Sequence, residues 1–236
     1  MDYDGFMAKL YVVATPIGNL EDISLRALRI LKEADLILSE DTRITKKLLE
    51  HYSISKPTIS YHQHSRLSKI SYILSQLKQG KNLALVSDAG APGISDPGSK
   101  LIEEAVKELG NQVEIISIPG PSAITAALSI SGLPADKFLF LGFPPSKKKR
   151  EKFFKEVVNF KYPVIFYESP HRILKSLEKL NEALTKNRKI IVCRELTKKF
   201  EIIYRGDIKE TINQLKEDKI RGEFVVIVGP PDKNAL

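Results

Sequence analysis

The stretch ALVSDAGAPGISDPGS, residues 84–99, carries three glycines, two prolines and two aspartates directly after an apolar run. A short aliphatic run, then turn-forming residues, then a helical pattern is typical of a buried strand, its loop and the next helix. Here the run LALVSD (83–88) enters the loop and a helical pattern over 99–109 follows it. The stretch therefore predicts one strand–loop–helix unit of an open, largely parallel sheet.

The same alternation extends through the first half of the chain. Further strand-like runs are LYVVAT, DLILSE, TISYH and VEIISI, and helical patterns cover residues 24–33 and 45–52. The second half differs, because five strand-like runs follow the helical segment PSAITAALSI with only two convincing long helices, around 147–159 and 170–184. This pattern predicts a mixed α+β sheet.

We therefore expect an α/β protein of two domains. Residues 1–8 precede the first strand-like run and are expected to form an N-terminal extension. Residues 9–120 are expected to form a domain with an open, mainly parallel sheet and flanking helices, and residues 121–236 a domain with a mixed α+β sheet.

Composition restricts the classes of function. The chain has 37 Lys and Arg against 29 Asp and Glu, a formal net charge of +8, which favours a polyanionic partner such as nucleic acid over a merely scattered surface excess. Cys193 is the single cysteine, so no internal disulfide can form and a reducing compartment, the cytoplasm, is expected. No apolar run approaches the about 18 residues of a membrane span, so no membrane contact is expected.

Chemically unusual residues follow the strand-like runs of the first half. They are Thr15, Pro16, Ile17, Gly18 and Asn19; Glu40, Asp41, Thr42 and Arg43; Asp88, Ala89 and Gly90; and Pro119, Gly120, Pro121 and Ser122. Ligands of open α/β sheets bind beyond the carboxyl ends of the strands, so these ends predict one ligand site. The usual pyrophosphate motifs are missing, and Asp88 on a glycine-rich loop favours a nucleoside with hydroxyl and ammonium groups over a triphosphate. The alternative is that the glycines and prolines only shape a tight turn.

Seven blocks in order resemble a known family. They are TPIGNLEDISLRAL (15–28), SEDTR (39–43), VSDAGAPGISDPG (86–98), PGPSA (119–123), FYESPHR (166–172), RELTK (194–198) and GEFVVIVG (222–229). Together they look like the ribosomal small subunit methyltransferase I group, the 16S rRNA cytidine 2'-O-methyltransferases of the tetrapyrrole methylase-like class III superfamily. The resemblance extends over about residues 10–229.

The resemblance implies S-adenosylmethionine held in a cleft between two α/β domains, a homodimer and no metal. It implies methylation of a cytidine 2'-hydroxyl in the decoding region of the small ribosomal subunit. Many members of the superfamily have GDP where this chain has Ser87, Asp88 and Ala89, and this departure favours RNA over a tetrapyrrole. The implied cofactor-binding residues are Pro16, Asp88, Ala91, Ser95, Ser122, Ala123, Tyr167 and Leu196.

A ribose hydroxyl is a poor nucleophile. Methyl transfer to it would therefore be helped by a positioned base, or by a charged group that stabilises the developing negative charge on its oxygen. The candidates are Glu40 with Asp41, Glu168 with His171, and Glu195 with Lys198. We select Glu195 and Lys198 as catalytic, since they supply a proton acceptor and a cation. A structural salt bridge for Glu195 and a local Glu168–Arg172 ion pair stay open as alternatives.

Substrate contacts are expected from cations. The run Lys147–Arg150 (Lys147, Lys148, Lys149 and Arg150) is placed at a helix start, where it opposes the helix dipole and so favours a phosphate contact, the alternative being a solvated helix start. Arg43, His171 and Arg172 complete the expected RNA-binding set. His62 and His64 have metal-like spacing, but no third ligand is evident nearby, and we expect no metal.

Two other functions compete with the rRNA methyltransferase. A tetrapyrrole C-methyltransferase of the same superfamily is disfavoured by the missing GDP, the basic composition and the RELTK block. An RNA-binding assembly factor without catalysis is disfavoured by the intact loops at the strand ends.

Overall fold

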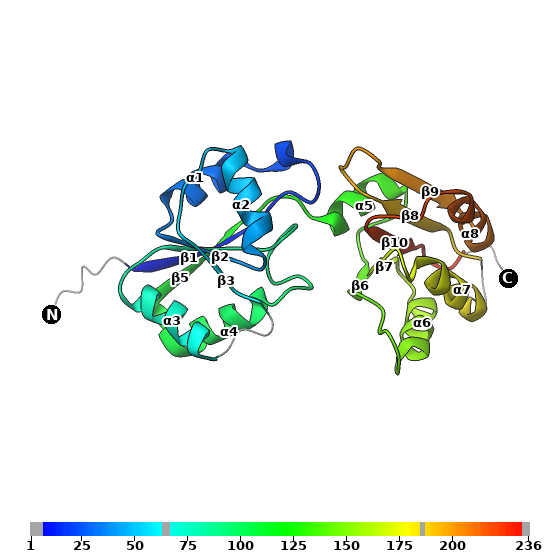
Figure 1. Cartoon of the computed structure of the whole chain (residues 1–236). Helices are drawn as coiled ribbons and strands as arrows, with labels where there is room; N and C mark the ends of the chain where they lie inside the picture. Colours follow the sequence, from blue (N-terminus) through cyan, green and yellow to red (C-terminus); the bar gives the residue numbers. More distant parts are fainter. Residues whose placement is uncertain (1–6, 63–66, 185–186, 233–236) are drawn as a thin grey trace. The chain divides into compact units, whose positions relative to one another are not determined.

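Five parallel strands form the sheet of the first half of the chain (Figure 1). The strands are β1 (Ala8–Val13), β2 (Leu36–Ser39), β3 (Thr58–Ser60), β4 (Leu83–Val86) and β5 (Val113–Ile118), in the order β3-β2-β4-β1-β5. Every residue of β2 and β4 is buried. Their uninterrupted LILS and LALV runs are explained by helices that cover both faces of the sheet.

The helices of this half divide between the two faces (Figure 1). Helices α1 (Leu25–Glu33) and α2 (Thr42–His51) pack on one face, and α3 (Leu67–Lys78) and α4 (Gly98–Leu109) pack on the other, each pair with its own apolar core. Ser24 caps α1 by accepting from the Ala27 N–H at 3.1 Å, and Asp41 caps α2 by accepting from the Arg43 N–H at 2.8 Å. Two short 3₁₀ helices lie at Leu20–Asp22 and Gly110–Gln112.

The second half forms a mixed sheet in the order β6-β7-β10-β8-β9. Its strands are β6 (Leu139–Phe140), β7 (Val164–Glu168), β8 (Ile190–Arg194), β9 (Ile202–Gly206) and β10 (Phe224–Val228). Among the described pairs of this second sheet, β6–β7 is parallel and the other three are antiparallel. Helices α6 (Arg150–Asn159), α7 (Ile173–Ala183) and α8 (Ile208–Glu217) share one core with the sheet, and α5 (Ala123–Ser131) contacts β10.

This computed structural model describes residues 7–62, 67–184 and 187–232. The chain divides into two units, of which the first ends at Ser122 and the second begins at Ala123. The predicted α/β class, a parallel sheet followed by a mixed one, is confirmed. In the described ranges, no helix combines the length and the apolar character needed to cross a membrane.

Several element predictions need correction. The expectation of only two long helices after 131 is wrong, because α8 is a third; its capping box, Asp207 with Glu210, was present in the sequence. Helix α3 was also missed, although Ile70, Ile73, Leu74 and Leu77 have helical spacing and are buried. The predicted extension 1–8 falls largely outside the described residues, but Ala8 is already part of β1, paired with Val113.

Candidate functional site

Strands β1 and β4 are neighbours whose following helices leave to opposite faces of the sheet. Helix α1 belongs to the core of one face and α4 to the core of the other. This is the topological switch point at which open α/β sheets form a ligand crevice. The two loops that leave it are joined, since Thr15 N donates to Gly90 O at 2.9 Å and Gly90 N donates to Thr15 O at 3.0 Å.

The loops after β2 and β5 reach the same place. The Asp41 N–H, just after β2, donates to Asp88 Oδ1 at 3.0 Å. After β5, a Cβ on Gly120 would lie 3.0 Å from the Ala14 Cβ, so the close approach of these loops depends on glycine. The predicted convergence of four strand ends is therefore confirmed, and we call this edge of the first unit the carboxyl rim.

A pocket of about 200 Å³ opens at the carboxyl rim, with Pro16 and Asp88 in its wall. The loop that carries Ala91 and Ser95 continues from it. Asp96 organises that loop, because its Oδ1 accepts from the N–H groups of Gly93 and Gly98, each at 2.7 Å. The sequence prediction missed this role of Asp96, and its position two residues before Gly98 was the available signal. Ser95 is exposed and has a φ of 62°.

Carboxylates gather at the carboxyl rim although the chain as a whole is basic. Burial, followed by the charges of Asp88, Asp96 and Asp41, raises the pKa of Glu40. Burial also raises the pKa of Asp88, and the charges of Asp41 and Asp96 add to this while the hydrogen bond from the Asp41 N–H opposes it. A cationic ligand would relieve this repulsion, so the rim suits a positively charged group.

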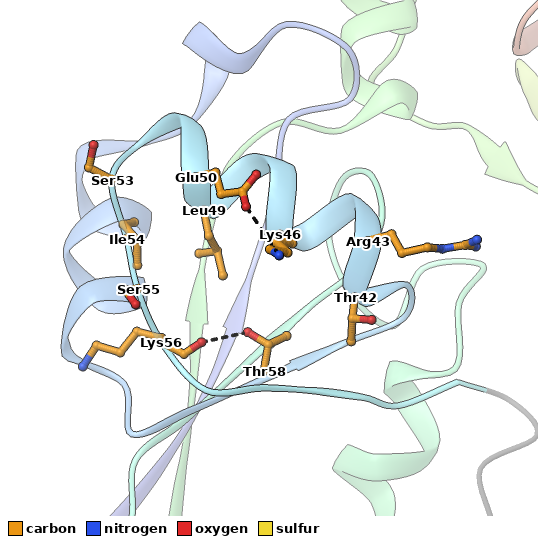
Figure 2. Close-up of a pocket in the computed structure, with 10 residues that line it drawn as sticks. All are labelled: Thr42, Arg43, Lys46, Leu49, Glu50, Ser53, Ile54, Ser55, Lys56 and Thr58. Carbon is orange, nitrogen blue, oxygen red and sulfur yellow. Dashed lines mark hydrogen bonds and ion pairs between the residues drawn. The ribbon is translucent and has the colours of Figure 1, made fainter.

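A second pocket of the first unit, of about 620 Å³, lies between α2 and the segment that leads into β3 (Figure 2). Cations and hydroxyl groups line it: Arg43, Lys46, Lys56, Thr42, Ser53, Ser55 and Thr58. In Figure 2, Lys46 faces Glu50, with 3.7 Å between Nζ and Oε1, and Arg43 extends away from the other side chains. The Arg43 guanidinium donates hydrogen bonds to the Asp41 carboxylate. These bonds lower the pKa of Asp41 to about 2.

In the second unit, Glu195 and Lys198 lie together in the turn after β8. Lys198 Nζ donates to Glu195 Oε1 at 2.8 Å and to Glu223 Oε2 at 3.0 Å, and the Glu223 N–H donates to Glu195 Oε1 at 3.0 Å. Burial would raise the pKa of Glu195, but the hydrogen bonds of Lys198 and of the Glu223 N–H outweigh it and lower that pKa. Burial would lower the pKa of Lys198, but both carboxylates outweigh it and raise that pKa. The sequence prediction missed Glu223, a neighbour of Gly222 in the GEFVVIVG block.

Glu168 ends β7 with a side chain that is 0% exposed and fully engaged. Arg172 Nη2 lies 2.8 Å from its Oε1, Arg150 Nη2 lies 3.6 Å from its Oε2, and the Ser176 hydroxyl donates to Oε2. The ion pair of Glu168 with Arg172, left open above, is present. The Glu168 carboxylate is thus engaged by contacts within the second unit, and its role as a base stays a prediction.

The four cations of residues 147–150 lie in two different surroundings. Lys147, Lys148 and Lys149 are exposed, and Lys149 has a φ of 76° just before α6. Arg150 instead turns inward, and its guanidinium donates to Pro145 O at 3.1 Å and to Ser176 Oγ. The helix was predicted to begin around residue 147 and begins at Arg150.

The remaining predicted residues lie in different surroundings. Ser122 is half-buried at the end of the first unit, and Ala123 opens α5 in the second. Tyr167 packs against Phe140 with ring centroids 5.0 Å apart, and burial, followed by the charge of Glu223, raises its pKa to about 12. Leu196 is buried, and His171 is exposed. His64 lies outside the described residues; within them, no three or more His, Cys, Asp and Glu side chains are grouped to hold a metal ion.

Comparison with known proteins gives one family. The model of the tetrapyrrole (corrin/porphyrin) methylases matches residues 9–212. A protein of Thermotoga maritima named ribosomal RNA small subunit methyltransferase I is 45% identical over 222 residues, which cover 94% of this chain and 98% of the relative. A protein of the same name from Halalkalibacterium halodurans is 48% identical over 220 residues, covering 93% of this chain and 75% of the relative.

Solved structures agree in fold. The cobalt precorrin-4 methyltransferase CbiF superimposes with a TM-score of 0.69 at 19% identity and covers 97% of both chains. The methyltransferase CobJ gives a TM-score of 0.69 at 21% identity and covers 94% of both chains.

Proposed function

Because the chain belongs to the ribosomal RNA small subunit methyltransferase I family of the tetrapyrrole methylases, we propose that it methylates a cytidine 2'-hydroxyl in the decoding region of 16S rRNA, with S-adenosylmethionine as the methyl donor. The enzyme would act in the cytoplasm, where its rRNA substrate is found. Assembly as a homodimer stays a prediction, to be tested by sedimentation.

The observation that carries this proposal is the group of carboxylates at the carboxyl rim. Burial, followed by the charges of their acidic neighbours, raises the pKa of Glu40 and of Asp88, in a chain of formal net charge +8. S-adenosylmethionine, when bound, supplies a methyl group on a positively charged sulfonium. Asp88 is suited to accept hydrogen bonds from its ammonium or ribose hydroxyl groups, and the glycine-rich backbone allows a close approach. Pro16, Ala91, Ser95 and Ser122 are assigned to the same contact.

Cofactor binding is tested by calorimetry on three variants. Loss of a hydrogen bond to a charged group costs about 1.5 to 3 kcal/mol, so Asp88→Ala should bind S-adenosylmethionine about 10- to 150-fold more weakly. Asp88→Asn can still accept from the Asp41 N–H and separates the effect of charge from that of loop geometry. Glu114→Ala, an exposed carboxylate on β5, is the matched control. Unchanged affinity in a folded Asp88→Ala protein would refute the assignment.

We assign recognition of the ribose hydroxyl that accepts the methyl group to the second unit. Since the pKa of Glu195 is lowered, this carboxylate holds a proton weakly, and the charge of Lys198 is suited to developing negative charge on the ribose oxygen. We assign Glu195 and Lys198 to orient the hydroxyl and stabilise its alkoxide character. Tyr167, Leu196 and Ala123 are assigned to the cofactor, as the sequence predicts.

Glu195→Gln separates these roles. Loss of a general base lowers the rate about 100- to 10,000-fold, so a fall of this size in the single-turnover rate, with normal binding of cofactor and subunit, would identify Glu195 as the base. A rate within about threefold of wild type is too small for such a loss and would leave positioning by Lys198 as the contribution of this turn.

RNA contacts are assigned to the exposed cations. Lys147, Lys148 and Lys149 are suited to phosphates, as are Arg43, Lys46 and Lys56 around the pocket of Figure 2. Arg150 and Arg172 would act indirectly, because they hold the segment before α6 against Glu168. His171 stays a predicted substrate contact.

The reaction itself is tested on purified small ribosomal subunits and on free 16S rRNA from a strain lacking the gene. Mass spectrometry of the nucleosides should find new 2'-O-methylcytidine that depends on the enzyme and on S-adenosylmethionine. Methylation of a base, or of precorrins in place of RNA, would contradict the proposed function.

A further inference from the structure

Phe200 is a large aromatic side chain that the second unit exposes to solvent. Its residue is 64% exposed, at the end of the turn that begins with Glu195. The ammonium group of Lys199, also exposed, lies 5.8 Å from the centroid of its ring. Single exposed apolar residues are common on protein surfaces, so exposure alone says little. Phe200 differs from such residues in the unusual backbone conformation of the turn that carries it.

The turn between β8 and β9 is held in a costly conformation. Glu195 and Thr197 have φ values of 53° and 66°, in the left-handed region that residues with a side chain rarely adopt. Such conformations persist only where the surroundings enforce them, and they are concentrated at functional sites. Neither residue is a glycine, so each holds this conformation with a side chain present.

Hydrogen bonds enforce this conformation on both sides of Lys199 and Phe200. Lys198 N donates to Glu195 O at 2.9 Å, Glu201 N donates to Lys198 O at 3.1 Å, and Thr197 N donates to Glu201 Oε2 at 2.6 Å. Gly222 leaves room for the Glu195 carboxyl group, whose Cδ would lie 2.2 Å from a Cβ at that position. The ring is therefore presented from a fixed backbone, which reduces the entropy lost when it binds a partner.

The chemistry of this surface fits one partner. An aromatic face beside an ammonium group complements an unpaired nucleobase and its phosphate, and such stacking accepts any base. We propose that Phe200 stacks on an unpaired nucleotide next to the one that is methylated, while Lys199 contacts its phosphate. This inference rests on the proposed function, because Glu195 and Lys198 of the same turn are assigned there to the acceptor.

The sequence offers a direct probe, since the chain contains no tryptophan. Phe200→Trp creates a single reporter whose fluorescence a stacked base quenches. Val106→Trp on α4 is the matched control, because Val106 is a similarly exposed residue, at 56%. Titration of both variants with a short unstructured oligoribonucleotide, and separately with small ribosomal subunits, should quench Phe200→Trp saturably and leave Val106→Trp nearly unchanged. Absence of quenching, or equal quenching of both, would overturn the proposal.

Kinetics supply the second readout. Stacking contributes enough that Phe200→Ala should raise the KM for subunits about 5- to 150-fold, with the affinity for S-adenosylmethionine unchanged. Phe200→Tyr should restore the KM to near the wild-type value. A normal KM in Phe200→Ala would overturn the inference. Quenching without any methyl transfer by the wild-type enzyme would instead refute the proposed function while supporting an RNA-stacking site.

Discussion

Glu40 is a carboxylate whose surroundings favour its protonated form. Its folded-state pKa lies above the ordinary value, through burial and then through the charges of Asp88, Asp96 and Asp41. The folded protein therefore holds the Glu40 proton more tightly than the unfolded chain does, so ionisation of Glu40 disfavours folding as the pH rises from the unfolded pKa through the folded one. A positively charged ligand at the carboxyl rim would relieve this cost, as the proposed binding of S-adenosylmethionine requires.

Glu40→Gln should accordingly be more stable than wild type at pH 7, and this difference should disappear as the pH falls below the ordinary glutamate pKa, where Glu40 is protonated in both the folded and the unfolded chain. Thermal unfolding without S-adenosylmethionine, followed over this pH range, measures the difference. Asp35→Asn, on the same unit, controls for a general change of charge. A wild type that is the more stable protein at pH 7 would show that the carboxylates at the rim are compensated within the chain itself.

Gly222 and Gly80 form a matched pair for the turn of Glu195. Both have a φ of 81°, but a Cβ on Gly80 meets nothing within 4 Å, whereas one on Gly222 meets the Glu195 carboxyl group. Both alanine variants should lose about 1 to 2 kcal/mol of unfolding free energy from the left-handed backbone. Gly222→Ala should also displace Glu195 and depress methyl transfer, while Gly80→Ala stays active. Equal activities would mean that the position of Glu195 does not matter for the reaction.

At the scale of helices and strands, the sequence predicts those features that neighbouring residues determine. The start of α1 is predicted within one residue, because Ser24 supplies a cap and the apolar spacing follows at once. The carboxyl rim is predicted because turn residues follow each strand directly. The contact of Glu195 with Glu223 joins residues 28 apart, and the inward turn of Arg150 depends on Glu168, so neither can be obtained from local patterns.

The Glu168 network holds β7, α6 and α7 together, and its removal gives a stability prediction. Removing one partner of a buried ion pair costs about 3 to 5 kcal/mol, because the remaining charges stay buried and uncompensated, so Glu168→Ala should strongly destabilise the second unit. The control is Glu151→Ala, which breaks an exposed pair with Lys155 on α6 and should change little.

Denaturant unfolding measures both variants, and Cys193 reports on the second unit alone. This thiol is buried, and its burial raises its pKa to about 12, so a thiol reagent should label it only after the unit opens. Labelling should be accelerated in Glu168→Ala and not in Glu151→Ala. If Glu168→Ala unfolds like wild type, the buried carboxylate is replaceable and Arg150 and Arg172 are free for RNA.

For the whole molecule, the distribution of charge matters more than its sum. The formal net charge is +8, yet the carboxyl rim gathers acidic side chains and Lys147, Lys148 and Lys149 form an exposed basic segment. Net charge alone predicts attraction to any polyanion. Local charge predicts that particular lysines contact phosphates and that each contact releases counterions from the RNA.

Two double variants separate net charge from local charge. Lys147→Ala/Lys148→Ala removes two exposed lysines of the basic segment, and Lys155→Ala/Lys179→Ala removes two that are paired with Glu151 and Glu182. Both lower the formal net charge of +8 by two. Binding to small subunits across a salt series should lose about 0.7 to 0.9 of log-log slope for each phosphate contact removed, in the first variant only. Equal losses would mean that the subunit responds to total charge, and the segment before α6 would then be ordinary solvated surface.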